Sequence, residues 1–89
     1  MNIIYKYPLH NTINKIPVGK PLCVAFQKGA PTIWVEHQQD APDDWPRMEI
    51  LVYGTGELIP AYSDTTYIGS ATSERWVFHV YLRKPEPDK

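Results

Sequence analysis

Nine prolines interrupt this chain of 89 residues, and their number restricts its fold more than any other feature. Proline lacks a backbone N–H and disrupts helix interiors, so the chain is expected to reverse often and to lack long helices. The segments between the reversals alternate in polarity. Residues 2–9, for example, place Ile3, Tyr5 and Tyr7 on one face, as a strand does.

Further runs rich in β-branched and aromatic residues follow, each bounded by turn residues. We expect strands over residues 2–9, 12–17, 22–28, 32–37, 47–54, 66–72 and 75–83. The sequence therefore predicts an all-β protein, a small six- to seven-stranded antiparallel sandwich or barrel. We expect one domain over residues 1–83 and a charged, proline-broken, flexible tail over residues 84–89.

Several local features predict particular structures. The Gly-containing turn at residues 28–31 predicts a hairpin, and the strand at 47–54 is apolar on both faces, which favours burial on both sides or a subunit contact. Gly69 is typical of a bend or bulge, Cys23 of a small buried residue and Trp76 of the core. The first and last strands are both apolar and aromatic, so we expect them to lie side by side.

Size and charge limit the classes of partner. The formal net charge is −1 and the basic residues are scattered, so neither duplex nucleic acid nor a membrane surface is an expected partner. The sequence has neither a signal peptide pattern nor an apolar run long enough to cross a bilayer, which predicts a soluble, cytoplasmic protein. A chain this short builds a marginal core, and this favours a homo-oligomer.

The residues that usually carry catalysis are not arranged for it. His10, His37 and His79 are far apart in the sequence, without the short spacing that places two imidazoles on one metal. The acidic run at residues 40–44 lacks the alternating ligands and glycine of a calcium loop. We therefore expect no metal, no cofactor and no enzymatic activity, and we interpret His79 as a hydrogen-bonded structural residue.

The stretch Tyr53-Gly54-Thr55-Gly56 follows a strand and has two interpretations. The glycines allow a ligand to approach the backbone, Thr55 adds a hydroxyl and Tyr53 offers a ring for stacking, so the segment is a candidate ligand loop. A phosphate loop normally opens a helix, however, and a plain turn at the strand exit explains the glycines equally well.

Aromatic and basic residues elsewhere supplement this candidate site. Trp34 shares a strand face with polar neighbours and is a candidate stacking platform, while Arg47 and Arg75 stand at strand starts from which a guanidinium can reach phosphate. A separate candidate surface for a protein partner is the acidic loop with an aromatic anchor, formed by Trp45, Asp43 and Asp44.

Four short motifs occur in a fixed order along the chain: IIYKYPL, YGTG, YIG and VFHVY. In this set the sequence resembles a family of short, uncharacterised phage and prophage proteins over nearly its whole length. The segments DAPDDWP and RKPEPDK depart from that pattern. The resemblance supplies no catalytic residues. At the level of class, the chain is also similar to small oligomeric phage sponge proteins, which hold nucleotide immune signals in pockets between subunits.

These observations leave three hypotheses, all of them non-enzymatic. The first is a sponge that sequesters a cyclic nucleotide or an ADP-ribose derivative in the cytoplasm of an infected cell. The second is an inhibitor that binds a host protein through the acidic Trp45 loop. The third is a structural virion or accessory β-domain.

Overall fold

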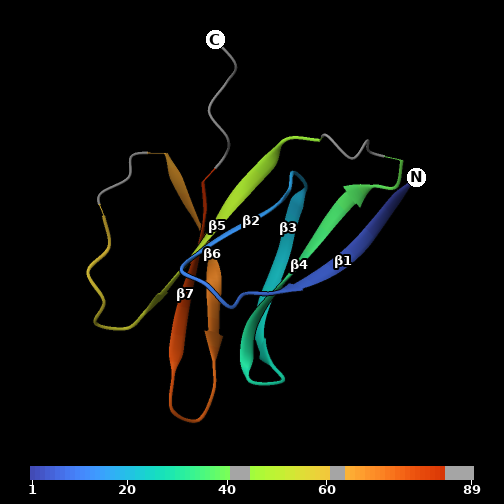
Figure 1. Ribbon diagram of the computed structural model, residues 1–89. Helices are drawn as coiled ribbons and strands as arrows, with labels where there is room; N and C mark the ends of the chain where they lie inside the picture. Colours follow the sequence, from blue (N-terminus) through green and yellow to red (C-terminus); the bar gives the residue numbers. More distant parts are fainter. Residues whose placement is uncertain (41–44, 61–63, 84–89) are drawn as a thin grey trace.

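The computed structural model describes residues 1–40, 45–60 and 64–83. These residues form seven strands and no helix, which confirms the predicted all-β class (Figure 1). Every run expected to be extended contributes one strand. Their bounds are β1 Asn2–Pro8, β2 Ile13–Pro17, β3 Lys20–Gln27, β4 Ala30–Gln38, β5 Arg47–Gly54, β6 Thr65–Thr72 and β7 Val77–Arg83.

The strands form two antiparallel sheets that pack as a sandwich. One sheet has the order β1-β4-β3, and the other has the order β2-β5-β7-β6. The prediction that the first and last strands are neighbours is wrong: β1 pairs with β4, whereas β7 lies between β5 and β6. The strand β7 contributes Val80 and Leu82 to the buried core, whereas β1 contributes the partly buried Tyr7.

The core lies between β4 of the first sheet and β5 and β7 of the second. Alternate residues of these strands point inward and exclude water almost completely, as a two-layer sandwich requires. The buried cluster consists of Leu9, Ile16, Ile33, Val35, Met48, Ile50, Val52, Val80 and Leu82. On the opposite face of β5, Leu51 and Tyr53 are also buried, which confirms that this strand is covered on both sides.

The predicted β3–β4 hairpin is confirmed, with Lys28 and Gly29 as its two-residue connection. Both residues have positive φ, 51° for Lys28 and 83° for Gly29, as a type I′ turn requires. Glycine adopts this conformation freely. For a residue with a Cβ atom, this backbone conformation costs about 1–2 kcal/mol. Lysine is not among the residues that such turns favour.

The two sheets approach each other most closely where their edge strands β3 and β6 meet. Each strand carries an irregularity there: the register of β3 shifts at Leu22, and that of β6 shifts at Ile68, next to the glycine predicted to mark a bulge. Because of the first shift, Cys23 pairs with Trp34 on the outward face. The thiol is therefore exposed, and the prediction of a buried cysteine is wrong.

A hydrogen-bonded histidine ties β1 to β4 at the far end of the core. The ring of His37 is 7% exposed, and its Nδ1–H donates to the carbonyl of Val18 at 3.2 Å. Nε2 is then left to accept the hydroxyl of Tyr7 at 2.8 Å. Burial raises the pKa of the Tyr7 phenol, the neighbouring Tyr5 adds to this rise, and Arg47 opposes it.

The β3–β6 contact generates a first prediction. A Cβ atom on Gly69 would lie 2.9 Å from Cγ2 of Val24, so Gly69→Ala should force the two edge strands apart. We expect a loss of about 1–3 kcal/mol, measured by urea unfolding. Adding Val24→Ala should recover part of this loss, because it makes room for the new methyl group. If the losses of the two single variants simply add in the double variant, the contact between Gly69 and Val24 does not limit how closely the sheets approach.

The Tyr7–His37 bond generates a second prediction. Tyr7→Phe should cost about 1 kcal/mol near neutral pH, because the buried Nε2 loses its donor. The raised pKa means that the folded state holds this proton more tightly than the unfolded state, whose tyrosine pKa is about 10. The stabilisation is therefore complete below about pH 10 and is lost as pH rises through the folded-state pKa. The wild-type and Tyr7→Phe unfolding curves should converge at high pH, and a constant difference would contradict this.

Candidate functional site

The YGTG stretch forms a tight turn at the end of β5. The amide of Glu57 donates to the carbonyl of Gly54 at 3.1 Å, and Gly56 has a φ of 92°, as the third residue of a type II turn requires. The amide of Thr55 donates to the carbonyl of Val77 at 3.2 Å. The turn is thus fixed against the start of β7.

A side chain of the protein already occupies the anion position of this turn. The amide of Gly54 donates to Oε1 of Glu57 at 2.7 Å, and a carboxylate in this place satisfies the donor that a phosphate would use. Its negative charge also repels a phosphate. The geometry therefore favours a turn over a phosphate cradle. Glu57 follows directly after the four residues that drew attention in the sequence.

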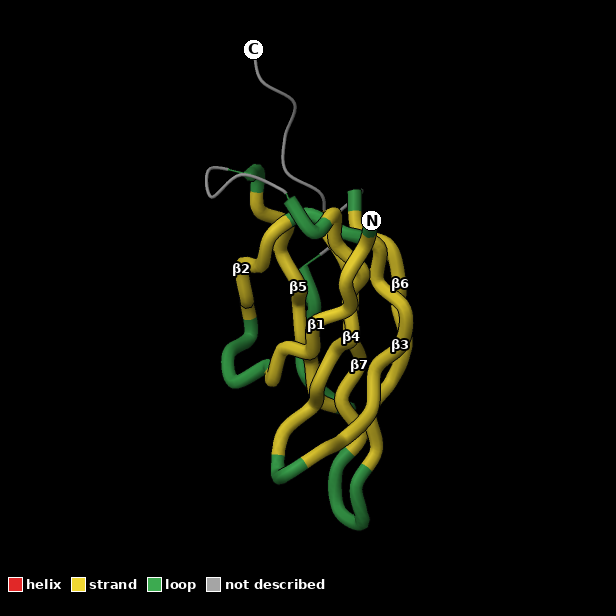
Figure 2. The backbone as a smooth tube through the Cα atoms, turned by 90° about the vertical axis from the view of Figure 1, so that its right-hand side faces the viewer, coloured by secondary structure: helices red, strands yellow, loops and turns green. Residues whose placement is uncertain are grey.

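A column of aromatic rings stands beside the turn. Phe26 of the first sheet stacks on Phe78 of the second, with ring centroids 6.2 Å apart, and Trp76 also stacks on Phe78, with centroids 6.5 Å apart. Trp76 is 61% exposed, so its prediction as a core residue is wrong. Trp76 lies in the connection just before β7, in the β6–β7 hairpin that extends beyond the β3–β4 turn (Figures 1 and 2).

The turn and the column enclose a hollow of about 510 Å³, which we call the Trp76 hollow. It has an apolar wall, one cationic side chain and one carboxylate. Three residues predicted from the sequence as ligand-binding meet here, Gly54, Thr55 and Arg75. The full lining is Gly54, Thr55, Glu57, Arg75, Trp76, Val77 and Phe78.

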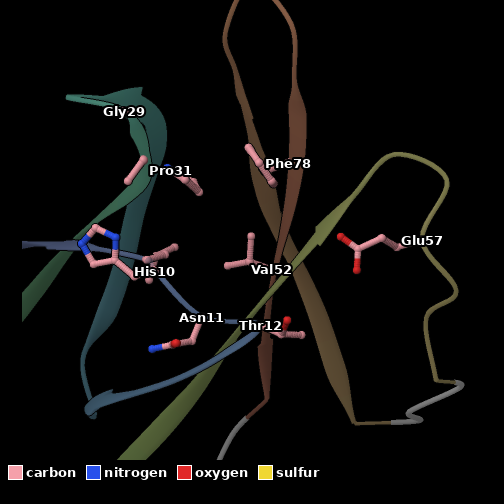
Figure 3. Close-up of a pocket in the computed structure, with 10 residues that line it drawn as sticks. His10, Asn11, Thr12, Gly29, Pro31, Val52, Glu57 and Phe78 are labelled. Atoms are coloured by element: carbon pink, nitrogen blue, oxygen red, sulfur yellow. The ribbon is translucent and has the colours of Figure 1, made fainter.

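A second hollow of about 300 Å³ opens between the sheets at the same end, and we call it the His10 hollow (Figure 3). Glu57 and Phe78 line both hollows, so the two are adjacent. Val52, Pro31 and Phe78 form apolar walls, while Glu57 faces His10 from the opposite side. Sequence reasoning missed this site, because the polar residues after β1 show no pattern that points toward Glu57.

The remaining predicted ligand-binding residues lie elsewhere. Tyr53 is only 5% exposed and packs edge-on against Tyr81, so its ring has no free face for stacking. Trp34 is half-buried on the outward face of the first sheet. Arg47 begins β5 and Gly54 ends it, which separates the two residues by about 23 Å at the usual strand rise.

The predicted partner loop is described only in part. Trp45 is half-buried just before β5, whereas Asp43 and Asp44 lie outside the described residues.

A chain of polar side chains crosses the outward face of the second sheet. The hydroxyls of Tyr67 and Ser70 are 2.5 Å apart, Ser70 Oγ lies 3.0 Å from His79 Nδ1, and His79 Nε2 lies 2.9 Å from Thr55 Oγ1. His79 is therefore hydrogen-bonded on both sides. Its partners were not foreseen, because the pairing of Ser70 with His79 depends on the bulge in β6.

This chain of hydroxyls and imidazole contains a serine beside a histidine. Enzymes that use a serine as nucleophile have the same pair. Acyl transfer also needs amide donors for the developing oxyanion. The nearby amides of Gly54 and Thr55 are already bonded, to Glu57 and to Val77. The arrangement anchors the YGTG turn to β7.

Within residues 1–40, 45–60 and 64–83, no group of three or more His, Cys, Asp or Glu side chains is placed to hold a metal ion. The same part of the chain contains no helix long and apolar enough to cross a membrane.

Comparison with known proteins yields a family without an assigned activity. No curated protein and no solved structure matches the chain. A model of a domain of unknown function, DUF7352, matches residues 1–89. The match covers the whole sequence, so the protein belongs to the DUF7352 family.

Proposed function

We propose that this protein is a non-enzymatic binding protein that holds a planar, nucleotide-type ligand in the Trp76 hollow. The observation that carries the proposal is the exposed indole of Trp76, stacked on Phe78 on one side and lining a hollow that also contains Arg75. A large exposed ring with an arginine beside it is a common feature of binding surfaces.

The chemistry of the hollow matches the parts of a nucleotide. A base can stack on Trp76, which contributes about 1–3 kcal/mol in other nucleotide-binding proteins. The guanidinium of Arg75 can pair with phosphate or stack on the base. The carboxylate of Glu57 accepts a hydrogen bond from the amide of Gly54 and retains acceptor capacity for the N–H edge of a base.

Binding of this kind is sufficient for a sponge, because sequestration requires only abundance and affinity. We therefore retain the proposal of a phage-type protein that lowers the concentration of a nucleotide immune signal in the host cytoplasm. Assembly into a homo-oligomer is part of this proposal. It is supported by the exposed Ile4 and Tyr5 on β1, an edge strand of its sheet.

A protein that binds this surface is the second candidate, and a different observation supports it. Leu58 is 96% exposed and Ile59 is 45% exposed, and both follow directly after Glu57 at the rim of the Trp76 hollow. Two exposed aliphatic residues that adjoin Glu57 in the sequence favour burial against a partner. A partner of this kind would require Leu58 and ignore nucleotides.

The proposal predicts a ligand-dependent gain in stability that requires Trp76. A thermal-shift screen should include cyclic dinucleotides, cyclic trinucleotides and ADP-ribose. A ligand at 100 times its dissociation constant stabilises the folded state by about 2.7 kcal/mol, which amounts to several degrees in a domain of this size. Trp76→Ala should weaken that ligand by roughly 5- to 150-fold through loss of stacking.

Trp34→Ala is the matched control, because it removes an indole from the outward face of the other sheet. Its ligand affinity should equal that of the wild type. Equal affinity in Trp76→Ala would refute the Trp76 hollow as the site. Absence of any shift, together with Leu58-dependent capture of a protein, would favour the second candidate.

A further inference from the structure

We infer that the outer side of the β3–β4 hairpin carries an anion subsite, which takes a phosphoryl group on Lys6, Lys28 and His10. A hollow of about 240 Å³ lies there, lined by Lys6, Pro8, His10, Gln27, Lys28, Ala30 and Thr32. Two lysines and a histidine line it, and its lining contains no carboxylate. In connecting this subsite to the other hollows, the inference rests on the proposed function.

The ammonium of Lys6 is held in place for such a role. Its Nζ donates to Oε1 of Gln27 at 2.9 Å, across the intervening strand β4. An ammonium has three N–H donors, so two remain for an anion. Among the described residues, Arg83 forms an ion pair with Glu49, and neither lysine of the hollow takes part in this pair. Their positive charges therefore act together on the hollow.

The backbone at Lys28 supplies an independent argument. Its φ of 51° is a conformation that asparagine or glycine adopts with less strain, and a type I′ turn favours those residues at this position. Lysine is thus a poor choice for the turn alone. Strained residues often occur where a side chain is needed for function. Here the strained position places a positive charge at the rim of the hollow.

The anion subsite is also continuous with the two hollows described above. His10 and Ala30 line both the subsite and the His10 hollow, which in turn shares Glu57 and Phe78 with the Trp76 hollow. The order along this surface is an indole, a carboxylate, an imidazole and two ammonium groups. A ligand with a flat base at one end and phosphate at the other matches that order.

The test separates charge from stability by means of Lys28→Asn. Asparagine favours the turn, so the variant should unfold at a temperature a few degrees above that of the wild type. It should nevertheless bind inorganic pyrophosphate roughly tenfold more weakly in a calorimetric titration at low salt, because a charge-assisted hydrogen bond is lost. Lys20→Asn, which removes a lysine at the opposite end of β3, should leave the affinity unchanged.

Pyrophosphate and ADP-ribose distinguish the subsite from the proposed function. Trp76→Ala should retain pyrophosphate binding and bind ADP-ribose more weakly, whereas Lys28→Asn should weaken the binding of both. Binding of pyrophosphate without ADP-ribose would support the subsite as a site for free phosphate and count against the nucleotide proposal. No pyrophosphate binding by the wild type, or equal binding by Lys28→Asn, would overturn the subsite.

Discussion

The stack of Phe26 on Phe78 is the contact on which the candidate site depends. It joins the two sheets at the end of the sandwich where the hollows open. Phe78 also stacks on the exposed ring of Trp76 and lines the His10 hollow. Aromatic pairs in this offset arrangement contribute about 0.5–1.5 kcal/mol beyond their buried area. The same contact therefore serves both stability and the shape of the site.

The position of the YGTG turn follows from hydrogen bonds to β7. Backbone and side chain of Thr55 are bonded to Val77 and His79, so the turn keeps a fixed place beside Trp76 and Arg75. Glu57 completes the turn and at the same time gives the hollow its carboxylate. The glycines thus shape the turn, and in the proposed site it is side chains rather than bare amides that would provide the chemistry.

The fold was largely predictable because its signals are local. Alternation of apolar residues marks each strand, and a glycine turn marks the β3–β4 hairpin. Three errors arose where the outcome depends on distant parts of the chain. The partner of β1 depends on the sheet order, and the exposure of Cys23 depends on a bulge. Trp76 is exposed because it lies in the connection before β7 and not in the strand itself.

The site was predictable only in part, for a related reason. Gly54, Thr55 and Arg75 were grouped as candidates from the sequence, and the structure places them in the lining of one hollow with Trp76. Trp34 and Arg47 have suitable side chains but lie on another face and at the other end of a strand. Composition indicates which residues can bind a ligand, whereas the pairing of strands decides which of them meet.

The most direct test of the central claim uses the indole N–H signals of the three tryptophans. A ¹H–¹⁵N correlation spectrum, assigned with Trp76→Phe, should be recorded during titration with ADP-ribose and with cyclic dinucleotides. The account predicts that one of these ligands shifts the Trp76 indole together with the amides of Thr55 and Gly56. The indole signals of Trp34 and Trp45 should stay in place. Shifts confined to Trp34 or Trp45, or no shift with any ligand, would contradict it.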